Sequence, residues 1–435
     1  MRLVLVDRPT PQRRNFYPLA LSRPIWELRC GMTSLGEKLF DRVRPAEMAC
    51  FLPPYLAGVW RTGWPVNDPQ SLVGTDLLVV DARVKADGLP KLDDGPSRVF
   101  LDGDGEVLAA RIVREDLAKL QTGSIDALLN TAKQILPVAP DIKLRVWNYI
   151  WELILANPAQ LIEDFRTAGH CGIDSTAQVE DPFAIRGSRS EIFVGRGAKI
   201  HPMVVLDAEH GPIYIDVGAE IHSFTRIEGP CYIGRDSILL GAKCREGNSI
   251  GPMCRIGGEV EESIIQGCSN KYHDGFLGHA YVGQWVNLGA LTTNSDLKND
   301  YSEVQITLDG RRQLPTGSTK VGALIGDHAK TSIGTLLNTG ACVGAMTVLV
   351  AGGRLLPKFI PTFTWYFNDA IIAGMGKEAA YATARTAMGR RKCQWTEADA
   401  AMWNAVYELT AEEREAIMKK SEIRSTKSET NPNVK

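Results

Sequence analysis

Residues 215–239 read IDVGAEIHSFTRIEGPCYIGRDSIL, and this stretch decides the fold of the second half of the chain. An aliphatic residue recurs at every sixth position, and small residues follow four positions later: Ile215, Ile221, Ile227, Ile233 and Leu239, with Ala219, Thr225, Cys231 and Ser237. A six-residue period fits neither a helix nor the two-residue alternation of a hairpin. It is typical of a parallel β-helix of triangular section, in which three hexapeptides make one coil.

The same period returns further along the chain. After a slip of one residue it resumes at Ile250 and Ile256, then at Val282 and Leu288, with later turns near Ile325, Val343 and Leu349. We predict that the aliphatic side chains point inward and that the small residues fit the corners. Hexapeptide solenoids of this kind wind left-handed, and their flat faces commonly associate around a threefold axis. We therefore expect a left-handed β-helix and a homotrimer.

The period fails twice, over residues 261–276 and 293–319, and we expect loops that project from the coils there. Polar residues fill both: Asn270, Lys271, His273 and Asp274 in the first, and Asn294, Asp296, Lys298 and Asp300 in the second. Polar insertions in a repetitive scaffold are natural places for function, although repeats also tolerate neutral insertions. We place the chemistry within residues 270–301. His273 and His279 are six apart, on one face rather than on stacked coils, which disfavours a shared metal, and His328 lies in a regular turn.

The first part of the chain predicts an α/β domain. Apolar runs at Leu3–Val6, at Leu77–Val80 and around 106–112 indicate strands, and a helix is expected to begin near Thr33. A strongly basic loop lies between the first strand and this helix, with Arg8, Arg13, Arg14, Arg23 and Arg29. Such a loop before a helix N-terminus suits phosphate, and a solvated basic surface is the alternative. Asp81 ends the second strand, where it either holds Mg²⁺ on a nucleotide or serves as a turn residue.

The pattern along the chain divides it into five parts. We expect an α/β domain over 1–125, a helical connector over 126–170, a β-helix over 171–370, C-terminal helices over 371–420 and a disordered tail over 421–435. The connector contains an apolar helical stripe at Trp147, Ile150, Trp151, Ile154 and Leu155, which predicts packing rather than a site. An aromatic cluster at Phe363, Trp365, Tyr366 and Phe367 is expected to plug the end of the solenoid.

Composition narrows the classes of protein that fit. Lys and Arg number 49 against 51 Asp and Glu, which disfavours nucleic acid as a partner. The nine cysteines form no CxxC pair and suit free thiols in a reducing compartment, so we expect a cytoplasmic protein. The sequence contains no uninterrupted apolar run of membrane-spanning length, and we expect no membrane partner.

Three stretches resemble a known family: LALSRPIWELRCG at 19–31, GGEVEESI at 257–264 and KYHDGFLGHAYVGQWVNLGA at 271–290. With the order of domains, they are similar to a shorter, divergent bacterial branch of the bifunctional N-acetylglucosamine-1-phosphate uridylyltransferase/glucosamine-1-phosphate N-acetyltransferase family. The resemblance implies a nucleotidyltransferase-like α/β domain followed by an acetyl-CoA-dependent acetyltransferase β-helix. It covers about residues 1–390 and is specific in the β-helix.

The resemblance assigns roles to individual residues. His273 takes the place of the catalytic base, Asn287 that of a sugar-contacting asparagine, and Ala290 that of the residue whose backbone lies beside the acetyl thioester. An imidazole can take the proton that an amine must lose, and a backbone N–H can stabilise the thioester oxyanion. We add Lys271 and Lys298 as substrate-binding residues and Asn294 as an acetyl-CoA-binding residue.

The chain also departs from that family. Glu262 or Ser263 stands in place of a lysine, Phe276 in place of a tyrosine and Leu291 in place of a glycine, which leaves the acceptor sugar open. The first domain lacks the family's Gly-rich GxGTRMxxxxPK loop. We expect Arg23, Arg29 and Lys38 to supply the phosphate contacts of that loop, with Asp81 as the Mg²⁺ ligand.

Three functions remain in view. The first is a sugar-1-phosphate enzyme with acetyl transfer from acetyl-CoA in the β-helix and nucleotidyl transfer from UTP or dTTP in the first domain. The second is a nucleotidyltransferase whose β-helix serves only as a trimer scaffold. The third is a non-catalytic regulatory subunit. The histidine stretch favours the first function, and the missing Gly-rich loop argues against full bifunctional activity.

Overall fold

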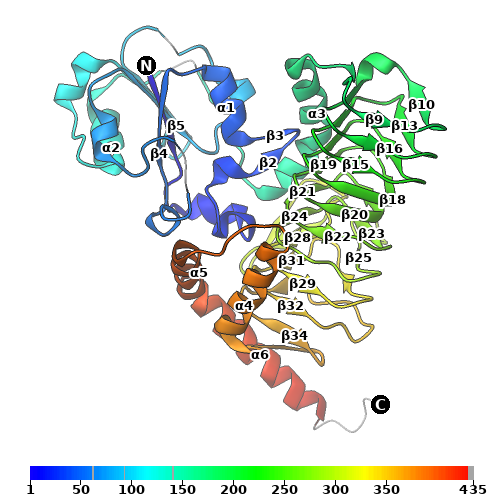
Figure 1. Cartoon of the computed structure of the whole chain (residues 1–435). Helices are drawn as coiled ribbons and strands as arrows, with labels where there is room; N and C mark the ends of the chain where they lie inside the picture. The colour runs from blue at the N-terminus through cyan, green and yellow to red at the C-terminus, as the bar shows by residue number, and fades with distance from the viewer. Residues whose placement is uncertain (61–62, 93, 140–141, 430–435) are drawn as a thin grey trace. The chain divides into compact units, whose positions relative to one another are not determined.

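The computed structural model describes residues 1–60, 63–92, 94–139 and 142–429, with side chains to Ser421. The chain forms two compact units (Figure 1). The first unit contains Met1–Phe16, Ser22–Leu28 and Thr33–Tyr149. The second unit contains Tyr17–Leu21, Arg29–Met32 and the chain from Ile150 onward. Two short N-terminal segments therefore belong to the second unit.

The first unit is built on one mixed sheet. Its order is β4-β1-β5-β7-β6, with β4, β1 and β5 parallel and β7 and β6 antiparallel to their neighbours. The strands are β1 (Arg2–Val6), β4 (Glu47–Phe51), β5 (Leu77–Asp81), β6 (Arg98–Leu101) and β7 (Val107–Ile112). The α/β domain predicted from the sequence is confirmed. The sequence patterns had not indicated β4 and β6.

Two helices accompany this sheet, α1 (Leu35–Val43) and α2 (Ile125–Ile135). Ser34 caps α1 by accepting the N–H of Glu37, whose carboxylate accepts the N–H of Ser34 in return. Leu128, Leu129 and Ala132 of α2 pack into the same core as the strands. The first unit therefore reaches Tyr149 instead of ending at residue 125, since α2 is a core helix of this unit and not part of a connector.

The second unit is a parallel β-solenoid with three faces. One face is a ten-stranded sheet of β8 (Gly172–Ile173), β11 (Ile192–Val194), β14 (Ile213–Ile215), β17 (Cys231–Ile233), β19 (Asn248–Ile250), β21 (Ile264–Gly267), β24 (Tyr281–Gln284), β28 (Leu324–Ile325), β31 (Cys342–Val343) and β33 (Phe359–Ile360). A second ten-stranded sheet supplies both other faces over the early coils, with β9 (Gln178–Val179), β10 (Ala184–Gly187), β12 (Lys199–Ile200), β13 (Val205–Ala208), β15 (Glu220–Ile221), β16 (Arg226–Glu228), β18 (Ile238–Cys244), β20 (Arg255–Glu261), β22 (Asn270–Lys271) and β23 (Phe276–Gly278). These faces continue as β25 (Thr293–Asn294), β29 (Lys330–Thr331), β30 (Leu336–Leu337), β32 (Val348–Leu349) and β34 (Trp365–Phe367), with β35 (Ala370–Ile372) antiparallel to β34.

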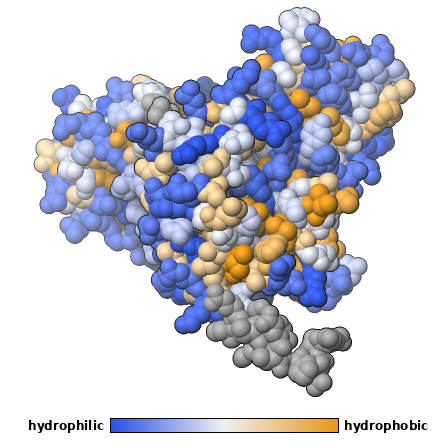
Figure 2. Space-filling view, turned by 60° about the horizontal axis from the view of Figure 1, so that its bottom comes forward, coloured by the Kyte–Doolittle hydropathy of each residue, from blue (hydrophilic) through white to orange (hydrophobic). Residues whose placement is uncertain are grey.

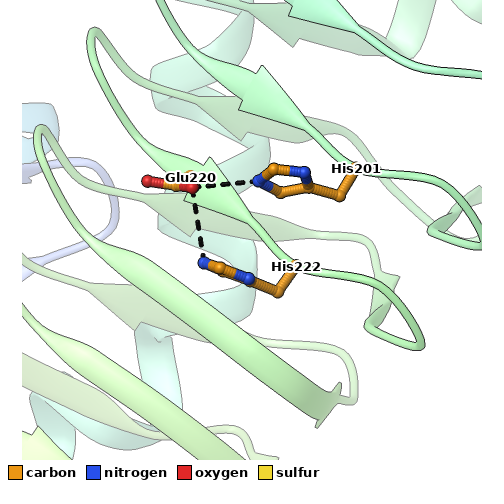
Figure 3. Close-up of side chains that lie close together, drawn as sticks. All are labelled: His201, Glu220 and His222. Carbon is orange, nitrogen blue, oxygen red and sulfur yellow. Dashed lines mark hydrogen bonds and ion pairs between the residues drawn. The ribbon is translucent and has the colours of Figure 1, made fainter.

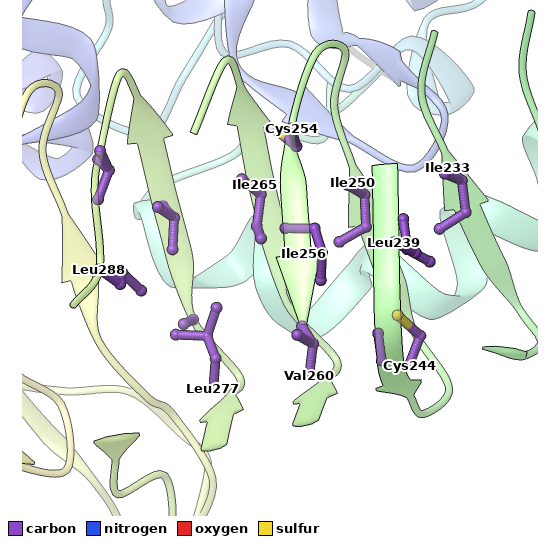
Figure 4. Close-up of a cluster of buried hydrophobic side chains, with 14 of the residues drawn as sticks. Ile233, Leu239, Cys244, Ile250, Cys254, Ile256, Val260, Ile265, Leu277 and Leu288 are labelled. Atoms are coloured by element: carbon purple, nitrogen blue, oxygen red, sulfur yellow. The ribbon is translucent and has the colours of Figure 1, made fainter. Parts of the chain in front are cut away.

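The six-residue period marks the inside of this solenoid. Every aliphatic residue that the period selected is at most 4% exposed: Ile215, Ile221, Ile227, Ile233, Leu239, Ile250, Ile256, Val282, Leu288, Ile325, Val343 and Leu349. Figure 4 shows several of them pointing into the interior of the solenoid from successive coils, together with Cys244 and Cys254. The small residues Ala219, Thr225, Cys231 and Ser237 are buried as well. The burial of these residues confirms the hexapeptide prediction. Close packing inside the coils favours aliphatic side chains at the inward positions and small side chains at the corners.

The first predicted interruption is wrong. Residues 261–276 do not project from the coils, because β21 and β22 continue the faces through them. Lys271 is the reason that the period looked broken. It pairs with Ile256 in the neighbouring coil and occupies an inward position that is only 3% exposed. A buried lysine at an aliphatic position hid one coil from the sequence pattern.

The second predicted interruption does leave the coils. Within 293–319, β26 (Gln305–Thr307) and β27 (Gln313–Pro315) form an antiparallel hairpin outside the parallel faces. Thr293 and Asn294 still lie in the array, because β25 pairs in parallel with β30. The excursion therefore begins after Asn294.

A long helix, α3 (Ile150–Ala168), packs against β17 and β19 of the solenoid. Ile150, Trp151 and Ile154 of the predicted stripe are buried, whereas Leu155 is 39% exposed. Among the described residues, no helix combines the length and apolarity that crossing a membrane requires.

Three helices follow the last coils, α4 (Gly376–Gly389), α5 (Glu397–Leu409) and α6 (Ala411–Glu429). Phe363 and Tyr366 are buried as the expected plug, while Phe367 is exposed. The disordered tail expected over 421–435 differs from the structure, since α6 continues to Glu429. Residues 430–435 lie outside the described part of the chain.

Candidate active site

His273 lies at a corner of the solenoid, directly after β22. Its side chain is exposed, and its ring meets the ring of Tyr272 edge-on at 5.1 Å between centroids. The β-helix thus presents this imidazole to solvent rather than using it in the core.

The adjacent coil places Ala290 beside His273. The N–H of Leu288 donates to the carbonyl of Asn270, and the N–H of Leu291 donates to the carbonyl of Asp274, both at 2.8 Å. His273 lies between Asn270 and Asp274, and Ala290 lies between Asn287 and Leu291, so these two connections bracket both residues. His273 and Ala290 therefore lie at the same corner on neighbouring coils. The structure brings together the two residues that the family resemblance assigns to proton transfer and thioester contact.

Lys271 supports the corner from inside. Its Nζ donates to the carbonyl oxygens of Gly257 and His273, both at 2.8 Å. Burial lowers the pKa of Lys271 to about 8, although the negative charge of Asp274 opposes the shift. The side chain predicted to bind substrate is thus a buried brace of the His273 backbone.

Asn287 is exposed on the same side of the coil array as β22. Its Oδ1 accepts a hydrogen bond of 3.1 Å from Asn270 Nδ2, and Asn270 Oδ1 in turn accepts one of 2.7 Å from Arg391. These two hydrogen bonds connect Asn287 through Asn270 to the guanidinium of Arg391, which lies in the C-terminal region of the same unit.

Asn294 and Lys298 have different surroundings. Asn294 is 1% exposed, and its amide bonds both the N–H and the carbonyl of Gly278 at 2.9 Å. This pairing ties two coils together. Lys298 lies on the excursion, 3.7 Å from Asp300, and also donates to Ser302. Asn294 is therefore buried and bonded to the neighbouring coil, whereas the side chain of Lys298 is partly exposed to solvent.

A buried histidine between two carboxylates was missed by the sequence patterns. His279 Nδ1 lies 2.9 Å from Asp296 Oδ2, and its Nε2 lies 3.3 Å from Glu262 Oε2. The ring is 3% exposed. Burial acts to lower the pKa of His279, but the hydrogen bonds and charges of Asp296 and Glu262 outweigh it and raise the pKa to about 9. Glu262, the residue in place of a family lysine, is therefore part of an ion-paired network.

Apolar side chains are exposed beside the His273 corner. Leu291 is 60% and Ile333 is 75% exposed, and the N–H of Gly334 donates to the carbonyl of Ala290 at 2.8 Å, which places the two side chains on adjacent coils. Leu355 is 55% exposed and lies one coil further on, where the bridge Leu336–Leu355 continues the array. Figure 2 shows one face of the molecule, on which apolar residues gather in small groups among polar ones. Exposed apolar groups of this kind mark contact surfaces.

In the first unit, Asp81 ends β5 directly beside the end of β1, since Asp81 pairs with Val6. Its carboxylate accepts hydrogen bonds of 2.9 and 3.3 Å from the guanidinium of Arg83 and one of 2.9 Å from the Arg83 N–H. Asp81 and Arg8 both line a small pocket at this edge of the sheet. Asp81 therefore lies at the carboxyl end of the parallel strands, as expected, and its carboxylate is ion-paired with Arg83.

The basic loop is mostly folded into the first unit. Arg13 is 2% exposed, and its Nε donates to both carboxylate oxygens of Asp7 at 3.1 and 3.0 Å. Burial raises the pKa of Asp7, while the charge of Arg13 opposes the shift. Arg23 is 7% exposed, and its carbonyl accepts a hydrogen bond from Arg13 at 3.0 Å. Lys38 is half-buried on α1.

Arg29 belongs to the second unit. Its N–H donates to Tyr281 Oη at 2.8 Å, and its carbonyl accepts from the same hydroxyl at 3.0 Å. Its guanidinium donates to the Met32 carbonyl and lies 5.4 Å from the centre of the Tyr232 ring. Arg23 and Arg29, which the sequence grouped in one loop, thus fall in different compact units.

A family model of sugar nucleotidyl transferases matches residues 3–170. The chain is 35% identical over 153 residues to the bifunctional sugar-1-phosphate nucleotidylyltransferase/acetyltransferase of Sulfurisphaera tokodaii, a match that covers 33% of this chain and 36% of that protein. It is 33% identical over 154 residues to the bifunctional protein GlmU of Albidiferax ferrireducens, covering 33% of this chain and 31% of that protein. The chain thus spans about a third of the length of the relatives that it matches.

Among solved structures, the UDP-N-acetylglucosamine acyltransferase of Francisella novicida aligns with a TM-score of 0.29 and 13% identity, over 57% of this chain and 87% of that one. The resemblance that the sequence motifs indicated is confirmed by the two sequence comparisons. Residues 3–170 match the sugar nucleotidyl transferase family, and the chain is similar to bifunctional sugar-1-phosphate nucleotidylyltransferase/acetyltransferases.

Proposed function

We propose that this chain is a sugar-1-phosphate enzyme of nucleotide-sugar biosynthesis. Its β-helix transfers the acetyl group of acetyl-CoA to the amine of an amino-sugar phosphate of the glucosamine-1-phosphate type. Its first unit transfers a nucleotidyl group from UTP or dTTP to a sugar-1-phosphate. The sequence match to sugar nucleotidyl transferases and the similarity to bifunctional relatives support this pair of activities.

The observation that carries the acetyl transfer is that His273 and Ala290 lie at the same corner of neighbouring coils. An exposed imidazole and the backbone of Ala290 occupy the same corner, and Lys271 holds the His273 carbonyl from inside. The base must reach the attacking amine nitrogen and the oxyanion donor must reach the thioester oxygen, so both groups have to lie close to one reacting carbon. Neighbouring coils of a parallel solenoid supply that spacing, since adjacent strands lie about 4.8 Å apart.

The chemistry follows from these two groups. The neutral imidazole of His273 takes a proton from the ammonium of the acceptor sugar, and the freed amine attacks the thioester carbonyl. The Ala290 backbone N–H stabilises the oxyanion of the tetrahedral intermediate. Collapse of that intermediate breaks the carbon–sulfur bond, and the nitrogen gives its extra proton to the departing thiolate. Coenzyme A and the amide are released, and the imidazolium returns its proton to solvent. No cysteine takes part, which agrees with the buried positions of Cys254 and Cys268.

The residues proposed to surround the acceptor differ from the family pattern, with Glu262 in place of a lysine and Phe276 in place of a tyrosine. Glu262 is paired with His279 rather than free to repel a phosphate, because His279 lies between Glu262 and Asp296 and pairs with both. Asn287, oriented by Asn270, is the proposed contact for the sugar hydroxyls. Phe276 offers a ring without the tyrosine hydroxyl, so the acceptor is expected to lose one polar contact there.

Nucleotidyl transfer is proposed at the carboxyl ends of β1 and β5. Asp81 offers the carboxylate oxygens that Mg²⁺ prefers, and the ion would neutralise phosphate charge there. Its ion pair with Arg83 must open for this role. Arg23 and Lys38 are the basic residues proposed to contact phosphate in this unit.

We further propose a homotrimer whose acetyl-transfer site is completed by a neighbouring subunit. The exposed Leu291 and Ile333 beside His273 support it, because burying them would also cover one side of the open imidazole.

One assay separates the three functions considered. Purified protein is incubated with acetyl-CoA, UTP or dTTP, each against glucosamine-1-phosphate and N-acetylglucosamine-1-phosphate, and the products are resolved by mass. Acetylated and nucleotidylated products together support the proposal. Nucleotidyl transfer without acetylation would make the β-helix a scaffold, and no turnover with any pair would favour a regulatory subunit.

A further inference from the structure

Two imidazoles and a carboxylate converge on the outside of the early coils. His201 follows β12 and His222 follows β15, and Glu220 lies between their rings (Figure 3). Glu220 Oε1 is 2.9 Å from His201 Nε2 and 3.4 Å from His222 Nε2. One ligand atom from each residue lies within 4.8 Å of the others. Both rings therefore aim the same nitrogen at one point.

The backbone beneath this cluster is fixed by the solenoid. β12 and β15 pair in parallel, and Ile200 and Ile221, which precede the two histidines, are buried in the core. The N–H of His201 donates to the carbonyl of Ile221, and the N–H of His222 donates to the carbonyl of Leu239, both at 2.9 Å. Two stacked coils thus hold the histidines at a set separation, with their ring centroids 4.7 Å apart.

From this geometry we infer that His201, His222 and Glu220 bind one divalent transition-metal ion, with Zn²⁺ as the best fit. Zn²⁺ takes imidazole nitrogen and carboxylate oxygen at about 2.0–2.2 Å in a tetrahedral arrangement. Two ligand atoms on such an ion lie about 3.4 Å apart, which follows from bonds of about 2.1 Å at the tetrahedral angle. The observed separations of 2.9 and 3.4 Å are close to that value. A fourth position is left for water.

Glu180 adds a support outside these ligands. Its Oε2 lies 3.7 Å from His201 Nδ1, on the ring nitrogen opposite the proposed metal. A carboxylate in this place favours the proton on Nδ1 and leaves Nε2 free to bind a metal. Glu180, His201 and His222 follow equivalent strands of three stacked coils, since 201 − 180 and 222 − 201 are both 21.

A simple hydrogen-bonded cluster accounts for part of the same geometry. Without a metal, the two Nε2–H groups would both donate to one oxygen of Glu220, and the hydrogen bond from His201 lowers the pKa of that carboxyl. The side chains of His201, Glu220 and His222 are 26%, 26% and 39% exposed, so an ion can reach them from solvent. The negative charge of Glu220, with Glu180 nearby, favours a cation over an anion.

Such an ion would join two coils near the start of the solenoid. An ion that binds the folded coils and not the unfolded chain raises the unfolding temperature in proportion to the logarithm of its concentration. His201 and His222 lie on coils that precede the coil of His273, so the cluster shares no residue with the proposed acetyl-transfer site.

The test uses the full chain without an affinity tag, stripped of metal, titrated with ZnCl₂ in a calorimeter. We expect one ion per chain. His201→Ala and His222→Ala should each weaken the affinity by more than about 100-fold, and Glu180→Gln by about 10–100-fold, the range for outer-shell partners. His210→Ala removes an exposed histidine of the same unit that lies outside the cluster, and it should leave affinity unchanged.

Two further measurements keep the outcome clear. Co²⁺ bound at the wild-type site should give the strong visible absorption of a tetrahedral centre, and Zn²⁺ should raise the unfolding temperature of the wild type but not of His222→Ala. Circular dichroism verifies that each variant is folded. Absence of a saturable isotherm in the wild type, or equal affinity in the two ligand variants and the His210 control, would overturn the site.

Discussion

Lys271 Nζ donates a hydrogen bond of 2.8 Å to the carbonyl oxygen of His273, two residues further along the same coil. The lysine fills an inward position of the solenoid, so its ammonium is held by the backbone and not by substrate. The position of the proposed base therefore depends on a buried charge behind it.

Lys271→Met keeps the length and apolar stem of the side chain but removes both hydrogen bonds to the corner. We expect acetyl transfer to fall by about 10–100-fold, because small displacements of a catalytic group are costly. The loss should be in kcat, with KM for the sugar little changed, as measured by steady-state kinetics. If KM rises instead and kcat is retained, Lys271 contacts substrate.

The matched control is Lys330→Met. Lys330 is half-buried at a position that pairs with the exposed Asn287, its Nζ donates to the carbonyls of Trp285 and His328, and burial lowers its pKa to about 8. This variant should lose stability without the selective loss of kcat. If kcat falls equally in both variants, the loss in Lys271→Met would be due to general destabilisation of the solenoid and not to displacement of His273.

His273→Asn tests the proposed base directly. Asparagine retains some hydrogen bonding but cannot take the proton from the ammonium, so acetyl transfer should fall by about 10²–10⁴-fold. Nucleotidyl transfer should persist. Acetylation at the wild-type rate in the variant would remove His273 from the mechanism.

Arg23→Ala and Arg29→Ala test the phosphate role of the basic loop. If each guanidinium contacts phosphate, the affinity for UTP should weaken by about 1.5–3 kcal/mol, typical of a charge-assisted hydrogen bond. Isothermal titration measures this change. Since the two arginines belong to different units, a loss in Arg23→Ala alone would confine the nucleotide to the first unit.

The solenoid was predictable because its core permits so few residue types. The six-residue spacing of Ile215, Ile221 and Ile227 arises from one packing requirement that repeats in every coil. Lys271 also occupies an inward position, but its buried ammonium group is stabilised by hydrogen bonds to two backbone carbonyls. No single-sequence pattern anticipates it, so the coil that contains it was taken for a loop.

Other features depend on contacts between distant residues. The N–H of Gly31 donates to Asn157 and its carbonyl accepts from Ser249, so the segment Arg29–Met32 joins the second unit through partners far along the chain. The pairing of His279 with Asp296 likewise needs the offset of 17 between coils, which becomes known only once the coils are in register. The spacing of 21 between His201 and His222 was visible in the sequence, but it fitted none of the familiar metal motifs.

Ile333→Glu tests the proposed trimer. Ile333 is 75% exposed beside Leu291, and a carboxylate placed in an apolar interface must be desolvated. We expect the wild type to sediment as a trimer and the variant to shift toward monomer, with acetyl transfer falling in parallel. Met375→Glu changes a residue of similar exposure in the same unit and should remain trimeric. A wild type that sediments as a monomer would refute the shared site.

The last prediction concerns the pH dependence of stability through His279. Its pKa is about 9 in the folded chain, against about 6.5 for an unfolded histidine. The folded state therefore binds the proton more tightly, and the stabilisation is complete below pH 6.5, declines as pH rises and is lost above pH 9. The difference corresponds to about 3 kcal/mol, from about 1.4 kcal/mol per unit of pKa.

His279→Gln isolates this contribution. Lys271 and Lys330 titrate in the same range with the opposite sign, because their lowered pKa values make the folded chain release protons before the unfolded chain does. The quantity to measure is thus the difference in unfolding free energy between wild type and variant, from urea titrations at pH 6 to 10. This difference should shrink by about 3 kcal/mol between pH 6.5 and 9. His210→Gln should show no such change, and parallel profiles for wild type and His279→Gln would contradict a buried imidazolium between Glu262 and Asp296.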